Sequence, residues 1–191
     1  MNTVGHDDPA EAEAGQQAWA KYLNQPVVQT NSIGMKLNLI PPGEFIMGSP
    51  VSEPERVVDE TQHLVKITKA YYLSAYEVTQ EQWKKVMGTT PSYHKGATLP
   101  VVRVSWEDAV KFCEKLTQME KEAGRLPEGW AYTLPTEAQW EYACRAGTTT
   151  AYSFGDTITP KQANYYEGKV GKTTSVDTYP ANPWGFHDMH G

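Results

Sequence analysis

The chain has 191 residues, with 17 Lys and Arg against 23 Asp and Glu, a formal net charge of -6 and 39% hydrophobic residues. These values describe one ordinary globular domain, long enough to bury a core without a disulfide or metal cross-link. Because there is no Lys or Arg cluster to attract phosphate or anionic lipid, the composition excludes nucleic acid and membrane surfaces as partners.

Residues 1–30 predict an acidic helical arm followed by a linker. Asp8 is a helix N-cap, Pro9 suits the first helical position, and Glu11 stands at the third. The helix is expected to end near Asn24, before Pro26. Its apolar stripe is predicted to comprise Ala18, Trp19, Tyr22 and Leu23. This helix is either a linker or an arm that docks on the rest of the chain.

The next part of the chain has the period of β-strands. Apolar and polar residues alternate over 35–40, and the Pro-Pro-Gly sequence at 41–43 leads into a second apolar stretch at 44–48. This pattern predicts a β-hairpin. A further strand is expected over 63–68, leading into 71–73.

Three later segments carry helix N-cap chemistry. Thr79 with Gln82, and Thr136 with Gln139, form capping boxes, and Ser105 caps a longer helix between them. The side chains predicted to face inward are Trp83, Val86 and Met87 in the first helix, Trp106, Ala109, Phe112, Cys113 and Leu116 in the second, and Trp140, Ala143 and Cys144 in the third. Both cysteines are therefore predicted to be buried free thiols, since they are not spaced as a C-x-x-C pair.

Residues 148–191 have no sustained period and are rich in Gly, Pro, Asn, Asp and aromatic residues. Loops and short strands are expected there. Without internal repeats, the sequence predicts one α+β domain over 31–191, preceded by the arm at 1–30.

At this point the sequence resembles the formylglycine-generating, or sulfatase-modifying factor, family. The matching segments are NSIGM (31–35), IPPGEFIMGS (40–49), YEVT (76–79), PVVRVSW (100–106), LPTEAQWEYA (134–143), ANY (163–165) and NPWGFHDMHG (182–191). They stand in the family's order. The resemblance implies a C-type-lectin-like α+β fold with little regular secondary structure.

The resemblance also implies a chemistry. Catalytic members oxidise a cysteine of a sulfatase polypeptide to formylglycine, using oxygen and a copper(I) ion held by two thiolates, which are soft ligands suited to that ion. Those two cysteines lie beyond the point where this chain ends, and neither Cys113 nor Cys144 matches them. The resemblance therefore predicts a C-terminally truncated domain, inactive as a fragment and without catalytic residues of its own. An edge left open is expected to cause marginal stability or self-association.

Calcium is the other metal that the resemblance implies. Some family members bind it through loop oxygen atoms, and the matching positions are Asn164 and Tyr165, with Glu167 as a candidate acidic ligand. A histidine site at His187 and His190 is disfavoured, since nearby glycine and proline oppose the helix that would align the two rings.

Two other functions remain open. The same fold can act as a noncatalytic lectin-like module that binds a peptide or a sugar through its aromatic loops. A more remote alternative is the iron-dependent sulfoxide synthase branch, which uses histidine ligands from an upstream helical domain that the sequence does not contain. Because neither a signal peptide nor an apolar run of about 18 residues is found, a cytoplasmic location is expected.

Overall fold

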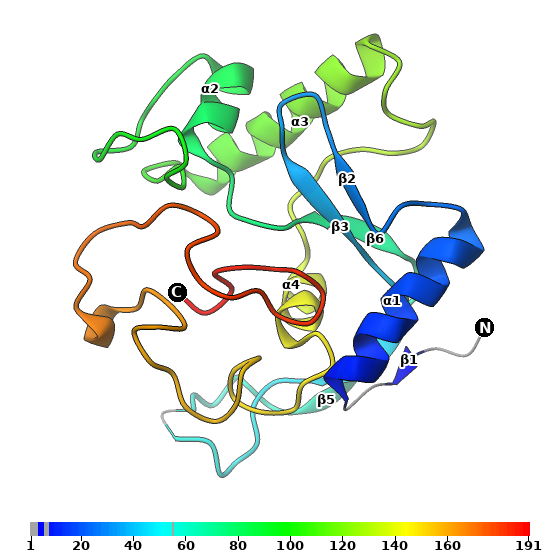
Figure 1. Ribbon diagram of the computed structural model, residues 1–191, viewed down its shortest axis with the longest axis vertical. Helices are drawn as coiled ribbons and strands as arrows, with labels where there is room; N and C mark the ends of the chain where they lie inside the picture. The colour runs from blue at the N-terminus through cyan, green and yellow to red at the C-terminus, as the bar shows by residue number, and fades with distance from the viewer. Residues whose placement is uncertain (1–3, 6–7, 55) are drawn as a thin grey trace.

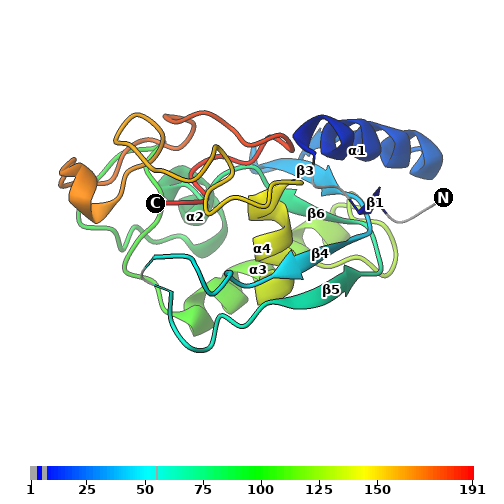
Figure 2. The same cartoon turned by 90° about the horizontal axis from the view of Figure 1, so that it is seen from below.

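The structure is a computed structural model that describes residues 4–5, 8–54 and 56–191. Its elements in chain order are β1 (Val4–Gly5), α1 (Pro9–Leu23), β2 (Val28–Thr30), β3 (Lys36–Ile40), β4 (Gly43–Met47), β5 (His63–Ile67), β6 (Tyr71–Ser74), α2 (Gln80–Met87), α3 (Trp106–Glu122), α4 (Glu137–Arg145) and the 3-10 helix η1 (Tyr166–Gly168). Figure 1 shows small sheets in the middle of the molecule, with α2 and α3 at one end. In Figure 2, α1 and the final loops lie on the same side of these sheets.

The strands form two small sheets, with the orders β1-β4-β5 and β2-β3-β6. The predicted hairpin is therefore wrong: β3 and β4 form where expected, but they belong to different sheets. A tight hairpin needs turn residues with positive φ, whereas proline holds φ near −65° and Gly43 is not among the positive-φ residues. The buried segment 41–43 instead carries the chain from one sheet into the other.

A first hydrophobic cluster joins the two ends of the chain. Its buried members are Ala12, Ile40, Ile67, Tyr142, Ala143, Ala146, Trp184 and Phe186. Helix α1 contributes to it through small residues, and Gln16 Nε2 donates hydrogen bonds to Leu39 O at 2.8 Å and Trp184 O at 3.3 Å. The indole of Trp184 donates to Ala12 O at 2.8 Å. Helix α1 is thus docked on the domain.

The predicted stripe on α1 is wrong, although the helix itself and its Asp8 cap are confirmed. The helix buries the face of Ala12, Gln16 and Ala20, while Tyr22 is 63% exposed. Small residues face inward because α1 approaches the neighbouring backbone closely: a Cβ placed on Gly147 would lie 2.7 Å from that of Ala12.

A second hydrophobic cluster lies between the sheet β2-β3-β6 and the helices α2 and α3. Its buried members are Ile33, Met35, Leu37, Trp83, Val86, Phe112 and Leu116. The rings of Trp83 and Phe112 stack with their centroids 5.3 Å apart and join the two helices. Most of the predicted inward side chains are confirmed, but Trp106 and Trp140 are 69% and 43% exposed. Trp106 is the first residue of α3 and lies ahead of the turns that cover the core.

All three predicted N-caps are confirmed as capping boxes, and for Ser105 the partner is Asp108. Of the two thiols, Cys144 is buried and Cys113 is partly buried; both are free. No helix in the described ranges is long and apolar enough to cross a membrane. The cytoplasmic location stays a prediction.

Residues 148–191 are mainly loops, as expected, but the predicted short strands are not found in this described stretch. It contains η1 and one isolated bridge between Tyr152 and Gly155. Asn182 holds the last loop: its Nδ2 donates to Ala143 O at 2.7 Å and Cys144 O at 3.1 Å. Its Oδ1 accepts from the backbone N–H groups of Trp184 and Phe186, both at 3.1 Å.

Candidate functional site

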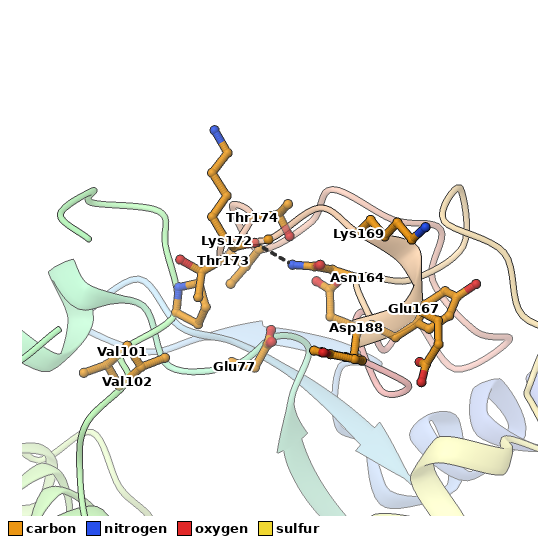
Figure 3. A pocket seen from close by; sticks show the side chains of 16 residues that line it. Glu77, Val101, Val102, Asn164, Glu167, Lys169, Lys172, Thr173, Thr174 and Asp188 are labelled. Carbon is orange, nitrogen blue, oxygen red and sulfur yellow. Dashed lines mark hydrogen bonds between the residues drawn. The ribbon is translucent and has the colours of Figure 1, made fainter. Parts of the chain in front are cut away.

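A cavity of about 860 Å³ lies where the final loops face the segment before α3. Its walls come from 100–102 on one side and from the loop 164–174 on the other, while Glu77, Asp188 and Gly191 complete the lining. Figure 3 shows these side chains, which come from segments far apart in the sequence. The volume is within the range of about 300–1,000 Å³ that is usual for ligand sites.

Two interacting carboxyl groups, Glu77 and Asp188, line this cavity. Desolvation raises the pKa of Glu77 above its ordinary value, and the charge of Asp188 raises it further. Desolvation likewise raises the pKa of Asp188, against a hydrogen bond from Asp177 N at 3.3 Å. Both groups therefore hold a proton more readily than an exposed carboxyl, and a cationic partner would favour their charged forms.

His187 lies beside this pair. Its Nδ1 is 2.8 Å from Tyr179 O, so the bond to a carbonyl assigns the proton to Nδ1. Its ring packs on Tyr76 with centroids 4.9 Å apart. The charge of His187 lowers the pKa of both carboxyl groups and so offsets part of the rise that desolvation causes.

The three candidate calcium ligands line the same cavity. Asn164 Nδ2 donates to Lys172 O at 2.9 Å, an exposed hydrogen bond that joins the two ends of the loop 164–172. The carbonyl of Tyr165 accepts from Gly168 N at 3.0 Å, and Glu167 is exposed in η1. The loop thus gathers all three residues along one wall of the cavity.

Their donor chemistry suits calcium in kind. An amide oxygen, a backbone carbonyl and a carboxylate are hard oxygen ligands of the type that calcium takes. Across the described residues, no three His, Cys, Asp or Glu side chains are grouped to hold a metal ion. A calcium site here would therefore depend mainly on Asn164 and main-chain oxygen, with Glu167 as its acidic ligand.

The two thiols do not fit a copper(I) site. Cys113 packs against the second cluster, whereas Cys144 lies by His190, with 3.6 Å between Sγ and Nε2. Burial raises the pKa of Cys113 and raises that of Cys144 to about 12, so both are protonated at neutral pH. Copper(I) needs two convergent thiolates, and the fold does not bring these cysteines together.

The two candidate histidines also have separate surroundings. His190 lies between Tyr152 and Phe154, with ring centroids 5.3 and 5.2 Å away. Its Nε2 accepts from Ser153 N at 3.0 Å, and desolvation lowers its pKa. His187 instead contacts Tyr76 and Tyr179. Each ring is thus held by its own local contacts.

Sequence reasoning missed Glu77 and Asp188 as site residues. Both belong to segments that resemble the family, 76–79 and 182–191, but there they received only structural roles. A signal was present: each is the only acidic residue of its motif. Their proximity, however, depends on how the final loops return to the end of β6.

The fold and the cavity define a loop-rich α+β domain whose candidate site is built by long ordered loops. Residues 24–191 match the FGE-sulfatase family, described as the sulfatase-modifying factor enzyme 1-like domain. The chain belongs to this family, which confirms the resemblance found in its motifs.

The curated relatives include proteins named as enzymes and one named as a chaperone. The chain is 36% identical to the formylglycine-generating enzyme of Mycobacterium tuberculosis (57% of this chain, 36% of that protein) and 32% identical to that of Mus musculus (57% and 29%). It is 29% identical to the chaperone protein LppX of Paenibacillus barcinonensis, covering 63% of this chain and 59% of that protein. The chain thus spans less than two thirds of the length of each.

Solved structures confirm the α+β fold with little regular secondary structure. PvdO from Pseudomonas aeruginosa is similar with a TM-score of 0.72 and 26% identity, over 86% of this chain and 70% of that one. Treponema denticola variable protein 1 gives a TM-score of 0.70 and 25% identity, over 85% and 73%. The similarity extends over most of this chain, so these two proteins share the fold described above.

Proposed function

We propose that this chain supplies the substrate-holding part of a formylglycine-generating type of domain. In this proposal the 860 Å³ cavity binds an extended segment of a sulfatase polypeptide that contains the cysteine to be oxidised. The observation that carries the proposal is that Glu77 and Asp188 line the same cavity as the apolar side chains of Val101 and Val102. A peptide with apolar side chains and a neighbouring cation complements both features.

The oxidation itself is not assigned to this chain's thiols. Cys113 packs against the second cluster and Cys144 lies beside His190, so the two thiols do not form a pair of copper(I) ligands. The role assigned here is to bind and orient the substrate.

Peptide binding tests the proposal directly. Fluorescence anisotropy of a labelled peptide spanning the modified cysteine of a sulfatase should show saturable binding. Glu77→Gln combined with Asp188→Asn should weaken it at least tenfold, while the exposed Glu114→Gln should leave it unchanged. Equal binding by both variants would overturn the assignment of this cavity.

Mass spectrometry tests the separation of binding from oxidation. Incubation with the peptide, oxygen and copper should produce no aldehyde at the peptide cysteine. Aldehyde formation that disappears in Cys144→Ser or Cys113→Ser would show that these thiols do react, and would reject the role described here.

Calcium binding at Asn164, Tyr165 and Glu167 forms part of the same proposal. The ion would order the loop 164–174, which forms one wall of the cavity. Calorimetric titration should show uptake of calcium that is lost in Asn164→Ala and weakened in Glu167→Gln. The absence of any heat in the wild-type chain would remove calcium from the proposal.

A noncatalytic binding module is the second candidate. The names of two relatives favour it: the chaperone LppX and a protein named inactive C-alpha-formylglycine-generating enzyme 2. A module of this kind would bind cysteine-free peptides or sugars as well as the sulfatase peptide. Replacing the peptide cysteine by serine separates the two, since a sulfatase-specific site should lose affinity.

A further inference from the structure

The cavity of about 860 Å³ carries charges of both signs in its lining. Glu77 and Asp188 form its acidic side. The loop 164–174 contributes Lys169 and Lys172, the only basic residues among the described residues that line the cavity. Figure 3 shows this loop across from the acidic pair, with both lysine side chains extending away from the two carboxyl groups. The charge therefore changes sign between the acidic side of the cavity and its exposed rim.

These charges are not paired within the part of the chain that the structure describes. Neither lysine forms an ion pair with a described acid, and Glu77 forms none with a described base. The carboxyl of Asp188 accepts a hydrogen bond from Asp177 N at 3.3 Å. Glu167 also lines the cavity, and with two lysines beside it the loop stays net positive. A ligand in this cavity therefore meets available charges of both signs.

Two threonines add hydrogen-bonding groups on the lysine side. Thr173 and Thr174 line the cavity, and their hydroxyl groups form no hydrogen bond with any described residue. A lysine ammonium group only donates hydrogen bonds and a hydroxyl can donate one, whereas an ionised carboxylate only accepts them. We call Lys169, Lys172, Thr173 and Thr174 the donor wall. Its chemistry suits a carboxylate.

A charged ligand that binds and leaves fits this lining better than an apolar segment packed there permanently. Lys169 and Lys172 are exposed to solvent. An apolar segment that covered them would remove their hydration without pairing their charges, which costs free energy. A peptide with charges of both signs replaces that hydration with complementary contacts on each side of the cavity. The lining therefore favours a separate peptide that carries an acid as well as a base.

We propose that the cavity selects an extended peptide with two charged side chains, a basic one that meets Glu77 and Asp188 and an acidic one that meets the donor wall. Lys169 and Lys172 are then specificity-determining residues, which favour a substrate with aspartate or glutamate near its basic residue. This inference rests on the proposed function. It adds the acidic residue of the substrate and the side chains that bind it.

Peptide binding at low ionic strength tests the need for the acidic residue. Fluorescence anisotropy compares labelled peptides that contain the cysteine and one lysine, with either aspartate or asparagine at a single position scanned on both sides of that lysine. Because ion pairs with exposed lysines are weak, the aspartate peptide should bind about fivefold more tightly at its best position. Sodium chloride at about 0.5 M should remove this difference by screening. Equal affinity of the two peptides at every position would overturn the proposal.

Charge reversal on the donor wall tests which residues bind the aspartate. In the variant that combines Lys169→Glu with Lys172→Glu, the preference should invert, so that the asparagine peptide binds more tightly. Lys161→Glu is the matched control, because Lys161 is exposed and precedes the same loop in sequence but does not line the cavity. The control should keep the preference for aspartate. A preference that survives charge reversal, or that the control loses equally, would reject the proposal.

The outcomes separate this inference from the proposed function. Glu77→Gln combined with Asp188→Asn should weaken the aspartate and asparagine peptides by similar factors. If that variant weakens binding but aspartate gives no advantage in the wild-type chain, the proposed function holds and only this inference fails. If no peptide binds the wild-type chain, both fail. The salt titration of the wild-type chain needs no variant, so the test does not depend on how the substituted chains fold.

Discussion

The two hydrophobic clusters are built in opposite ways. The first joins α1, α4 and the final loop, and much of its order comes from side chains that bind backbone groups, such as Asn182 and Gln16. The second is built from a sheet and two helices with capping boxes, yet it contains a cavity of about 420 Å³. Regular secondary structure therefore does not by itself ensure close packing.

The physical reason lies in where backbone groups are satisfied. A loop in the core must have its N–H and C=O groups paired, so polar side chains are placed there with defined geometry. In the second cluster the helices and strands satisfy most of their own groups. The outer edges of β2 and β6 are left without a strand partner among the described residues.

Trp184→Ala should produce the largest effect on this comparison. Trp184 is 2% exposed, packs on Tyr142 with ring centroids 4.9 Å apart, and donates to Ala12 O. Its removal should lower the free energy of unfolding by about 3–5 kcal/mol. Chemical denaturation measures this value, with the more exposed Trp140→Ala as the control. Equal losses in the two variants would contradict a tightly packed first cluster.

Asn182→Ala should have the next largest effect and should lower the free energy of unfolding by about 2–3 kcal/mol. The substitution leaves buried backbone donors and acceptors without partners. Asn182→Asp separates the contributions, since it keeps the acceptor for Trp184 N and Phe186 N but loses the donor to Ala143 O. Denaturation of both variants should place Asn182→Asp at or below wild type in stability. A wild-type value for Asn182→Ala would show that the final loop is held by packing alone.

Leu116→Ala should lower the free energy of unfolding by about 2 kcal/mol, which is at the low end for such a substitution. The side chains around the 420 Å³ cavity of the second cluster, which Leu116 lines, have room to relax. Leu116 is fully buried, so a closed core would give a larger loss. The partly exposed Leu23→Ala serves as the matched control. A loss above 4 kcal/mol would mean that the second cluster is packed as closely as the first.

The smallest effect should be the stability that is lost at acid pH when Glu120 is protonated. Desolvation alone would raise the pKa of this carboxyl, but hydrogen bonds from Arg125 and Ser32 outweigh it, and the pKa lies below its ordinary value. The stability that Glu120 contributes is therefore present above about pH 4.3 and is lost as the pH falls through the lowered pKa. Because Arg125 is 49% exposed, solvent screening limits the effect.

Thermal unfolding between pH 7 and pH 3 measures this contribution. The midpoint of the wild-type chain should fall more steeply at the acid end than that of Glu120→Gln. Parallel curves would show that Glu120 has the same pKa in the folded and unfolded chains.

Much of the local structure follows from short-range rules. The capping pairs at Thr79, Ser105 and Thr136 set the starts of three helices, and alternation set the strands over 36–40 and 63–67. These features depend on residues within a few positions of one another, so sequence reasoning reaches them. The predicted faces were less secure: Trp106 and Trp140 fit their helical periods and are nevertheless partly outside the core.

The pairing of strands and the candidate site required the full fold. Residues 41–43 disfavour a tight hairpin, but they do not indicate which strands pair, because that outcome depends on β5 and β6 as partners. Glu77 and Asp188 likewise meet only when the final loop returns. Calcium ligation by Asn164, Tyr165 and Glu167 stays a prediction.

The sequence by itself determined the family, the class of fold, and the positions and caps of its helices, since motifs and periodicity are local properties of the chain. The tertiary structure decided which face of α1 is buried, how the strands pair, and where the cavities form. Those features arise from contacts between residues far apart in the chain, whose free energies depend on shape and on satisfied backbone groups rather than on residue order.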